Sequence, residues 1–290
     1  VERIDWTPFF RTWELKGSYP KIFDDPTVGE QATQLYADAL NLLDRIVADR
    51  LLTAKAAFGI FRANSNGDDI ELRGDDGSEP IAVIPCLRQQ MAKGGDRPNI
   101  SLADFVAPKT TGLEDYIGAF VVTTGHGLDE LTAEFEAKHD DYHSIMAKAL
   151  ADRLAEALAE RLHEIVRTDY WGYGEEESFT NDELIGESYT GIRPAPGYPS
   201  CPDHTAKTIL FELLDATSAT GVELTESMAM FPTASVSGWF LANPEAFYFG
   251  LGKIGVDQVK DYAKRTGKPV AEIEKWLSPN LAYEPSGGGK

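Results

Sequence analysis

The chain has 290 residues, of which 42% are hydrophobic, so it can bury a substantial core. Its formal net charge of -20 repels phosphate backbones and anionic lipids, which argues against nucleic acid or a membrane as a partner. Two cysteines cannot build a disulfide framework, and no apolar run approaches the roughly 20 residues that cross a bilayer, so we expect a cytoplasmic protein.

The first half of the chain predicts helices around short strands. Residues 26–52 repeat apolar side chains at helical spacing, which predicts an amphipathic helix that packs on a sheet. A second long helical pattern covers 128–167, and we expect it to break near His139–His143 into two helices. Strands are predicted at 57–62, 81–85 and 116–124.

The second half begins with a proline-rich segment, Gly191–Pro202. Its four prolines exclude a helix interior and a central strand, so an ordered, extended loop is expected. Residues 286–290 are expected to form a disordered tail. Helices are predicted at 205–214, 256–265 and 269–277, and strands at 224–230 and 248–254, on either side of a turn at Asn243-Pro244.

The N-terminal residues do not resemble a signal peptide. Val1–Trp6 has no initiator methionine, no basic segment and no apolar segment, and this start is typical of a piece of a longer chain.

Common catalytic and nucleotide-binding motifs are missing from the sequence. It has no glycine-rich dinucleotide turn, no P-loop and no nucleophile elbow, so an independent hydrolase lacks support. His139 and His143 are spaced to share a metal on a helix, but no third ligand is evident, and a solvated or helix-capping pair is the alternative. Asp141 and His143 begin a pattern that ligates cobalt in some proteins, but Met146 stands where that pattern requires glycine.

Three charged residues are candidates for contacts with a ligand. Asp152 and Glu156 are four residues apart on a predicted helix, so they share a face that is either solvated or able to receive a cationic group. Arg193, in the proline-rich loop, suits either a carboxylate ligand or an ordinary surface salt bridge.

Five peptides, in order along nearly the whole chain, resemble the C-terminal activation domain of cobalamin-dependent methionine synthase. The proline-rich peptide with its downstream Cys-Pro and the N-terminal peptide are long and unusual in composition, so coincidence is remote. The peptides are DWTPFF at 5–10, LADFVAP at 102–108, HDDY at 139–142, RPAPGYP at 193–199 and SVSGW at 235–239.

The resemblance implies a mixed α+β fold with a twisted antiparallel sheet flanked by helices, in a single C-shaped domain over residues 1–285. It also implies a shallow groove for S-adenosylmethionine and no catalytic acid, base or metal ligand. In such a site Arg193 suits the ligand's carboxylate, and nearby carboxylates suit its amino and sulfonium groups. The positions that match the family's ligand contacts are Asp5, Glu156, Arg193, Tyr198, Tyr248 and Phe249.

The function that the resemblance implies is reactivation of methionine synthase, by methylating cob(II)alamin as it is reduced. The cobalamin is carried by a partner domain absent from this chain, and the electron comes from a flavodoxin-like protein or a flavoprotein reductase. The chain alone is not expected to synthesise methionine. An alternative is a docking module for the reductase or the cobalamin domain that has lost ligand binding, although the presence of Asp5, Glu156, Arg193 and Tyr248 argues against it.

Overall fold

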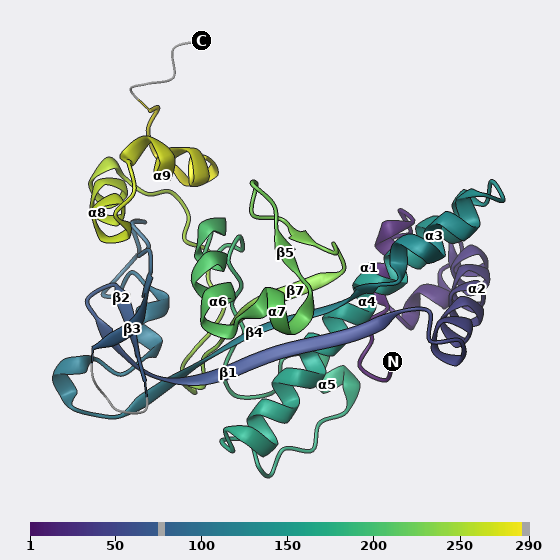
Figure 1. Cartoon of the computed structure of the whole chain (residues 1–290), viewed down its shortest axis with the longest axis horizontal. Helices are drawn as coiled ribbons and strands as arrows, with labels where there is room; N and C mark the ends of the chain where they lie inside the picture. Colours follow the sequence, from purple (N-terminus) through teal and green to yellow (C-terminus); the bar gives the residue numbers. More distant parts are fainter. Residues whose placement is uncertain (75–78, 286–290) are drawn as a thin grey trace. The chain divides into compact units, whose positions relative to one another are not determined.

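A computed structural model describes residues 1–74 and 79–285, which divide into two compact units (Figure 1). The first unit comprises Val1–Ala57, Val121–Tyr189 and Thr217–Val236, and the second comprises Phe58–Phe120, Thr190–Ala216 and the chain from Ser237 onward. The expectation of one C-shaped domain over 1–285 stays a prediction. The tail expected at 286–290 lies outside the described residues.

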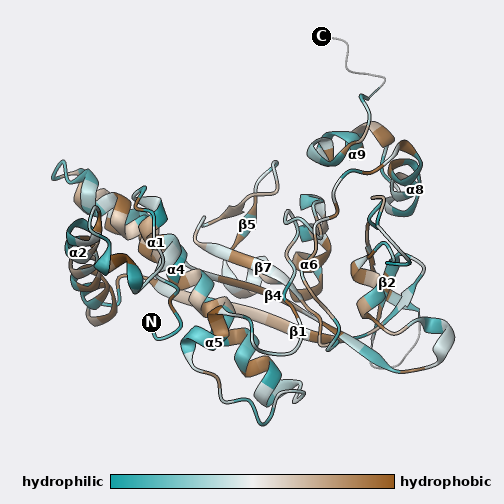
Figure 2. Cartoon of the chain, turned by 180° about the vertical axis from the view of Figure 1, so that it is seen from behind, coloured by the Kyte–Doolittle hydropathy of each residue, from teal (hydrophilic) through white to brown (hydrophobic). Residues whose placement is uncertain are grey.

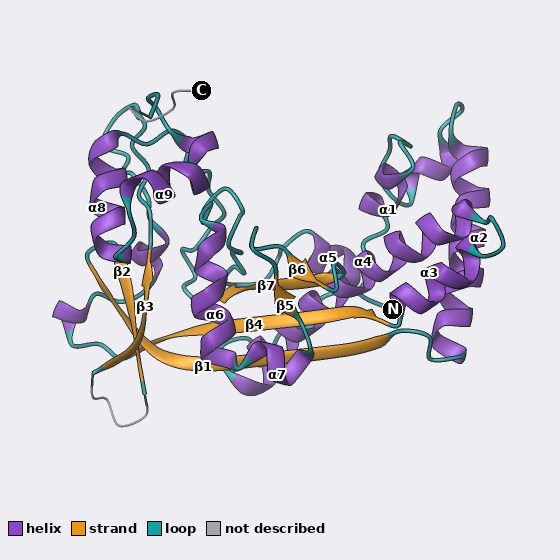
Figure 3. Cartoon of the chain, turned by 45° about the horizontal axis from the view of Figure 1, so that its top comes forward, coloured by secondary structure: helices purple, strands orange, loops and turns teal. Residues whose placement is uncertain are grey.

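An antiparallel five-stranded sheet with the order β3-β2-β1-β4-β7 confirms the predicted α+β class (Figure 3). The hairpin between β1 and β2 pairs Asn66 with Asp69 and turns at Gly67, whose φ of 64° suits glycine. The strands are β1 Thr53–Asn66, β2 Asp69–Arg73, β3 Pro80–Pro85, β4 Asp115–His126 and β7 Ser235–Phe240, with a separate pair formed by β5 Glu223–Leu224 and β6 Met230–Phe231.

Strand β4 confirms the prediction for 116–124 and is buried over most of its length. Its β-branched and aromatic residues suit a strand covered on both faces, and Figure 2 shows it mostly in the hydrophobic colour.

The first unit is built around two long helices, α2 and α4, with an aromatic cluster at the start of the chain. Helix α2 confirms the prediction for 26–52, and its apolar face is buried. Trp6 packs edge-on to Phe9 and to Tyr36 of α2, with ring centroids 5.4 and 4.9 Å away. The helices that lie wholly or mostly in this unit are α1 Thr7–Thr12, α2 Gly29–Ala48, α3 Leu128–Glu136, α4 Asp141–Ile165, α5 Asn181–Ile185 and α7 Ala216–Thr220.

The second unit carries α6 Lys207–Leu214, α8 Val256–Thr266 and α9 Val270–Trp276, as the sequence predicts within two residues. Helix α8 ends at Thr266, capped by Gly267 in the left-handed conformation, and Pro269 is the N-cap of α9. The two helices bury Val259, Tyr262, Ile273 and Leu277 in a shared cluster.

The strands predicted at 224–230 and 248–254 are wrong. The first segment turns back on itself between Leu224 and Met230, because the amide of Thr225 donates to the carbonyl of Ala229. The second forms no strand ladder in the described part of the chain; its backbone is held by the isolated bridge of Ile254 with Leu281 and by the bond from the amide of Leu251 to the carbonyl of Pro199. The strand of this region is β7, whose SVSGWF sequence we did not assign to a strand.

In the described part of the chain, no helix is both long and apolar enough to cross a membrane.

Candidate functional site

The proline-rich loop is ordered, as predicted, and it is held by strand β7 and its continuation. Ile192 and Leu241 exchange two backbone hydrogen bonds of 2.9 and 3.0 Å, and the amide of Trp239 donates to the carbonyl of Pro194 at 2.9 Å. The prolines lack amide donors, so the loop is anchored largely through its carbonyls. This anchoring fixes the backbone on both sides of Arg193.

Gly238 permits the close approach of β7 to the loop. A Cβ at this position would lie 2.8 Å from the carbonyl oxygen of Pro194 and 3.0 Å from the ring of Phe120. Neither group can move freely, because Pro194 belongs to the anchored backbone and Phe120 stacks on Phe240 at 4.5 Å.

We therefore expect Gly238→Ala to displace the loop, lowering the thermal midpoint and weakening ligand binding together. Differential scanning fluorimetry and ligand titration measure the two effects. Gly67→Ala is the matched control, because a Cβ at Gly67 meets nothing within 4 Å while its positive φ still strains alanine. If Gly238→Ala binds ligand as the parent chain does, the close approach has no part in shaping the loop.

Four of the six predicted ligand contacts lie in the second unit, and Arg193 and Tyr248 touch directly. The backbone amide of Arg193 donates to the Tyr248 hydroxyl at 2.9 Å. Tyr198 and Tyr248 are 60% and 42% exposed, so both rings are available to a ligand, whereas Phe249 is buried. The amide of Leu251 donates to the carbonyl of Pro199 at 2.8 Å and ties the two segments together.

The LADFVAP peptide packs against the Tyr248–Phe249 segment. Phe105 lies edge-on to Phe247 and Phe249, with centroid distances of 5.7 and 6.3 Å. The side-chain amide of Asn243 donates to the carbonyl of Phe105 at 3.3 Å. This peptide therefore packs beneath the segment that carries two predicted ligand contacts.

Asp5 and Glu156, the other two predicted contacts, lie in the first unit. Asp5 precedes α1, and its Oδ1 accepts a hydrogen bond of 2.9 Å from the amide of Thr7. Glu156 lies half-buried on α4, one turn after Asp152, which is exposed and pairs with Arg153 at 2.5 Å. Asp152 is thus an ordinary surface carboxylate, while the role of Glu156 stays a prediction.

The HDDY peptide caps a helix. Helix α3 ends at Glu136 and α4 begins at Asp141, so the predicted break is confirmed, and His139 lies between the two helices. Oδ1 of Asp140 accepts a hydrogen bond of 3.1 Å from the amide of His143, and Oδ2 of Asp140 lies 2.8 Å from Nδ1 of the His143 ring. These contacts hold the pKa of the Asp140 carboxyl below its usual value.

The cap is Asp140 and not a histidine, and His139 is exposed, which fits the solvated alternative for that residue. No group of three metal-ligating side chains occurs in the part of the chain that the structure describes.

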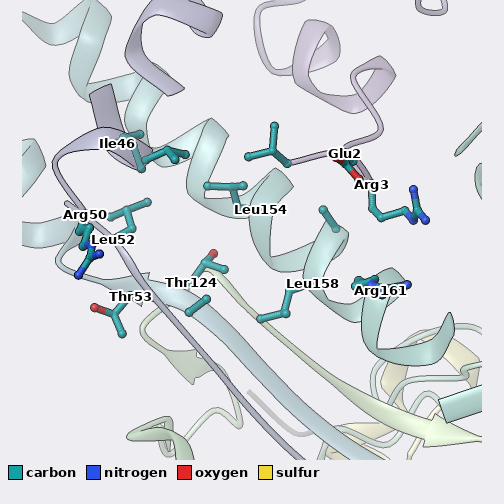
Figure 4. Close-up of a pocket in the computed structure, with 14 residues that line it drawn as sticks. Glu2, Arg3, Ile46, Arg50, Leu52, Thr53, Thr124, Leu154, Leu158 and Arg161 are labelled. Carbon is teal, nitrogen blue, oxygen red and sulfur yellow. The ribbon is translucent and has the colours of Figure 1, made fainter. Parts of the chain in front are cut away.

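The first unit also has an open groove of about 780 Å³, and its lining includes none of the six predicted residues (Figure 4). Leu154 and Leu158 of α4 form part of an apolar floor with Ile46 and Leu52, and Arg50 and Arg161 lie at its edge.

Sequence reasoning missed Gly238, which lets β7 approach the loop closely. The glycine inside an otherwise bulky strand was the available signal, since such a glycine often marks a close backbone approach.

Comparison with known proteins decides the family. The model described as "Vitamin B12 dependent methionine synthase, activation domain" matches residues 1–267. The chain belongs to this family. It is also similar to a solved structure described as the MetH reactivation domain bound to AdoHcy, with 54% identity and a TM-score of 0.95 over 98% of this chain and 87% of that chain. The resemblance seen in the five peptides is confirmed, and the activation domain is a module of a methyltransferase.

Proposed function

We propose that this activation domain binds S-adenosylmethionine and supplies its methyl group for the reductive reactivation of cobalamin held by another domain of methionine synthase. The observation that carries the proposal is the likeness, over 98% of the chain, to a reactivation domain bound to AdoHcy, which is S-adenosylhomocysteine, the demethylated form of that ligand. The local geometry supports it, because the anchored loop carries Arg193, whose backbone amide donates to the hydroxyl of Tyr248.

We assign each predicted contact a role that suits its chemistry. The guanidinium of Arg193 pairs with the ligand's carboxylate, which it can hold through two parallel hydrogen bonds. Backbone groups of the loop and of Tyr248–Phe249 bind the adenine edge, while the exposed rings of Tyr198 and Tyr248 shield its face. Asp5 and Glu156 are the carboxylates that favour the ligand's amino and sulfonium cations.

The reaction asks little acid–base chemistry of this chain. The reduced cobalamin of the partner domain supplies the nucleophile that accepts the methyl group. The residues of this chain bind the donor, hold its methyl group in a fixed direction and shield it from water. We therefore assign binding residues and no general base.

The partners follow from the same proposal. The cobalamin domain of the enzyme must meet the bound ligand, and a flavodoxin-like protein or a flavoprotein reductase must deliver the electron. An acidic surface, with 47 acidic against 27 basic residues, is suited to a partner with a basic patch. The reducing cytoplasm is the compartment in which such an enzyme and its electron donor would meet.

Isothermal titration calorimetry of the purified chain tests the proposal. We expect saturable one-to-one binding of S-adenosylmethionine, and of S-adenosylhomocysteine, which lacks the sulfonium charge. S-adenosylmethionine should lose more affinity as salt rises, because it carries the sulfonium cation in addition to the ammonium group that both ligands share. If neither ligand binds, the proposal fails for this chain and the docking-module alternative remains.

A further inference from the structure

A histidine that contacts the proline-rich loop is paired with a buried lysine. Lys207, at the start of α6, is only 7% exposed, and its Nζ lies 3.0 Å from Nδ1 of His204. The His204 ring lies against Gly197 of the loop so closely that a Cβ on Gly197 would overlap it. Burying an ammonium group is costly unless partners satisfy it, and the 3.0 Å contact makes Nδ1 of His204 one of the groups that do so.

The loop turn above His204 is closed by its own hydrogen bonds. The amide of Gly197 donates to the carbonyl of Cys201 at 2.7 Å, and the amide of Cys201 donates to the carbonyl of Tyr198 at 2.9 Å. Asp203, the residue before His204, accepts hydrogen bonds from the amide of Thr205 at 2.8 Å and from the Tyr262 hydroxyl at 2.9 Å. The His204 ring therefore lies against a closed turn, and the preceding residue is held by two hydrogen bonds, so a shift of the ring toward the loop would displace the turn.

We infer that His204 and Lys207 are positioning residues, which hold the turn at Gly197 in the conformation that presents Arg193 and Tyr198 to S-adenosylmethionine. The inference rests on the proposed function of this loop. Lys207 acts as donor, so Nδ1 of His204 accepts and the ring carries its proton on Nε2. This hydrogen bond fixes the ring orientation on which Gly197 rests.

The charges around His204 make the arrangement dependent on pH. Burial and the adjacent Lys207 ammonium lower the pKa of His204, while Asp203 acts in the opposite direction. Burial likewise lowers the pKa of Lys207. From α9, Trp276 faces the His204 ring at 6.5 Å, and Lys275 lies over that indole. Protonating His204 removes the acceptor and sets two cations side by side, so the turn loosens in acid.

Three variants test the inference. We expect His204→Ala and Lys207→Met each to weaken S-adenosylhomocysteine binding about 5-fold or more, the factor that one lost hydrogen bond of about 1 kcal/mol implies. Both should speed amide exchange at Gly197 and Cys201 in the ligand-free chain. His204→Asn, which retains an acceptor for Lys207, should recover part of the loss. Lys253→Met, on an exposed lysine of the same unit, is the control.

A pH titration adds a readout that a merely structural role would not move. In the parent chain, the affinity for S-adenosylhomocysteine should fall as the pH drops through the lowered pKa of His204. NMR of the His204 ring measures that pKa. Lys207→Met removes the neighbouring cation, so the pKa of His204 should rise.

The inference is overturned if His204→Ala and Lys207→Met leave amide exchange at Gly197 and Cys201 unchanged. It is also overturned if they speed that exchange but leave the affinity for S-adenosylhomocysteine unchanged. If the parent chain binds no ligand, the proposed function fails, and amide exchange alone decides whether the two side chains hold the turn.

Discussion

Replacing Arg193 by alanine is expected to weaken S-adenosylmethionine binding by about 2 kcal/mol or more, because it leaves the ligand carboxylate without its charged partner. That loss corresponds to a roughly 30-fold rise in Kd. The fold should persist, since the backbone of Arg193, and not its guanidinium, makes the hydrogen bond to Tyr248. Titration calorimetry with both variant and parent chain measures the effect.

Arg97→Ala provides the matched control for this substitution. Arg97 belongs to the same unit, is exposed, and its Nε donates only to the carbonyl of Gly94 among the contacts described. The Arg97→Ala substitution removes an identical charge from the chain without changing the proline-rich loop. Equal affinities for Arg193→Ala and Arg97→Ala would remove Arg193 from the binding site.

The largest loss of stability is expected from Arg167→Ala. Arg167 is fully buried, its Nε donates to Glu177 at 2.8 Å, and its guanidinium lies 3.9 Å from the ring centroid of Tyr189. Removing it leaves the mostly buried carboxylate of Glu177 without this partner, which costs about 3–5 kcal/mol for a buried pair. Chemical denaturation followed by circular dichroism measures the free energy of unfolding.

Two comparison variants separate the charge from the bulk of Arg167. Arg161→Ala removes an arginine that is half exposed and pairs with Glu164, so it should cost less than about 1 kcal/mol. Arg167→Met also removes the charge but keeps much of the side-chain volume, so it should be less destabilising than Arg167→Ala because it leaves a smaller cavity at this fully buried position. A cost for Arg167→Ala no greater than that for Arg161→Ala would mean that this buried pair does not stabilise the unit.

The longer helices were predictable from sequence because their signals are local, whereas the short helices α1, α5 and α7 were not predicted. Periodic apolar residues located α2, and the polar His139–His143 segment marked the break that Asp140 caps. Gly267 and Pro269 marked the end of one helix and the start of the next. Strand β7 was missed because its pairing partner β4 is over a hundred residues away, and short apolar runs look alike with or without a partner.

Less of the candidate site than of the helices could be predicted from the sequence. Four prolines were enough to predict an ordered loop, but the ligand contacts came from family resemblance, since no spacing in the sequence joins Arg193 to Tyr248. The burial of Lys207 could not be predicted either, because a lysine at the start of a helix is ordinarily solvated. Such residues are recognised only when the packing around the loop is known.

Transfer of an isotopically labelled methyl group tests the central claim most directly. The chain is mixed with the separately prepared cobalamin domain of the enzyme, S-adenosylmethionine labelled at its methyl carbon, and a chemical one-electron reductant. We predict that label appears on cobalamin much faster with the chain than without it, and that Arg193→Ala removes most of this acceleration. Equal labelling with and without the chain, under conditions in which the chain binds the ligand, would contradict the account.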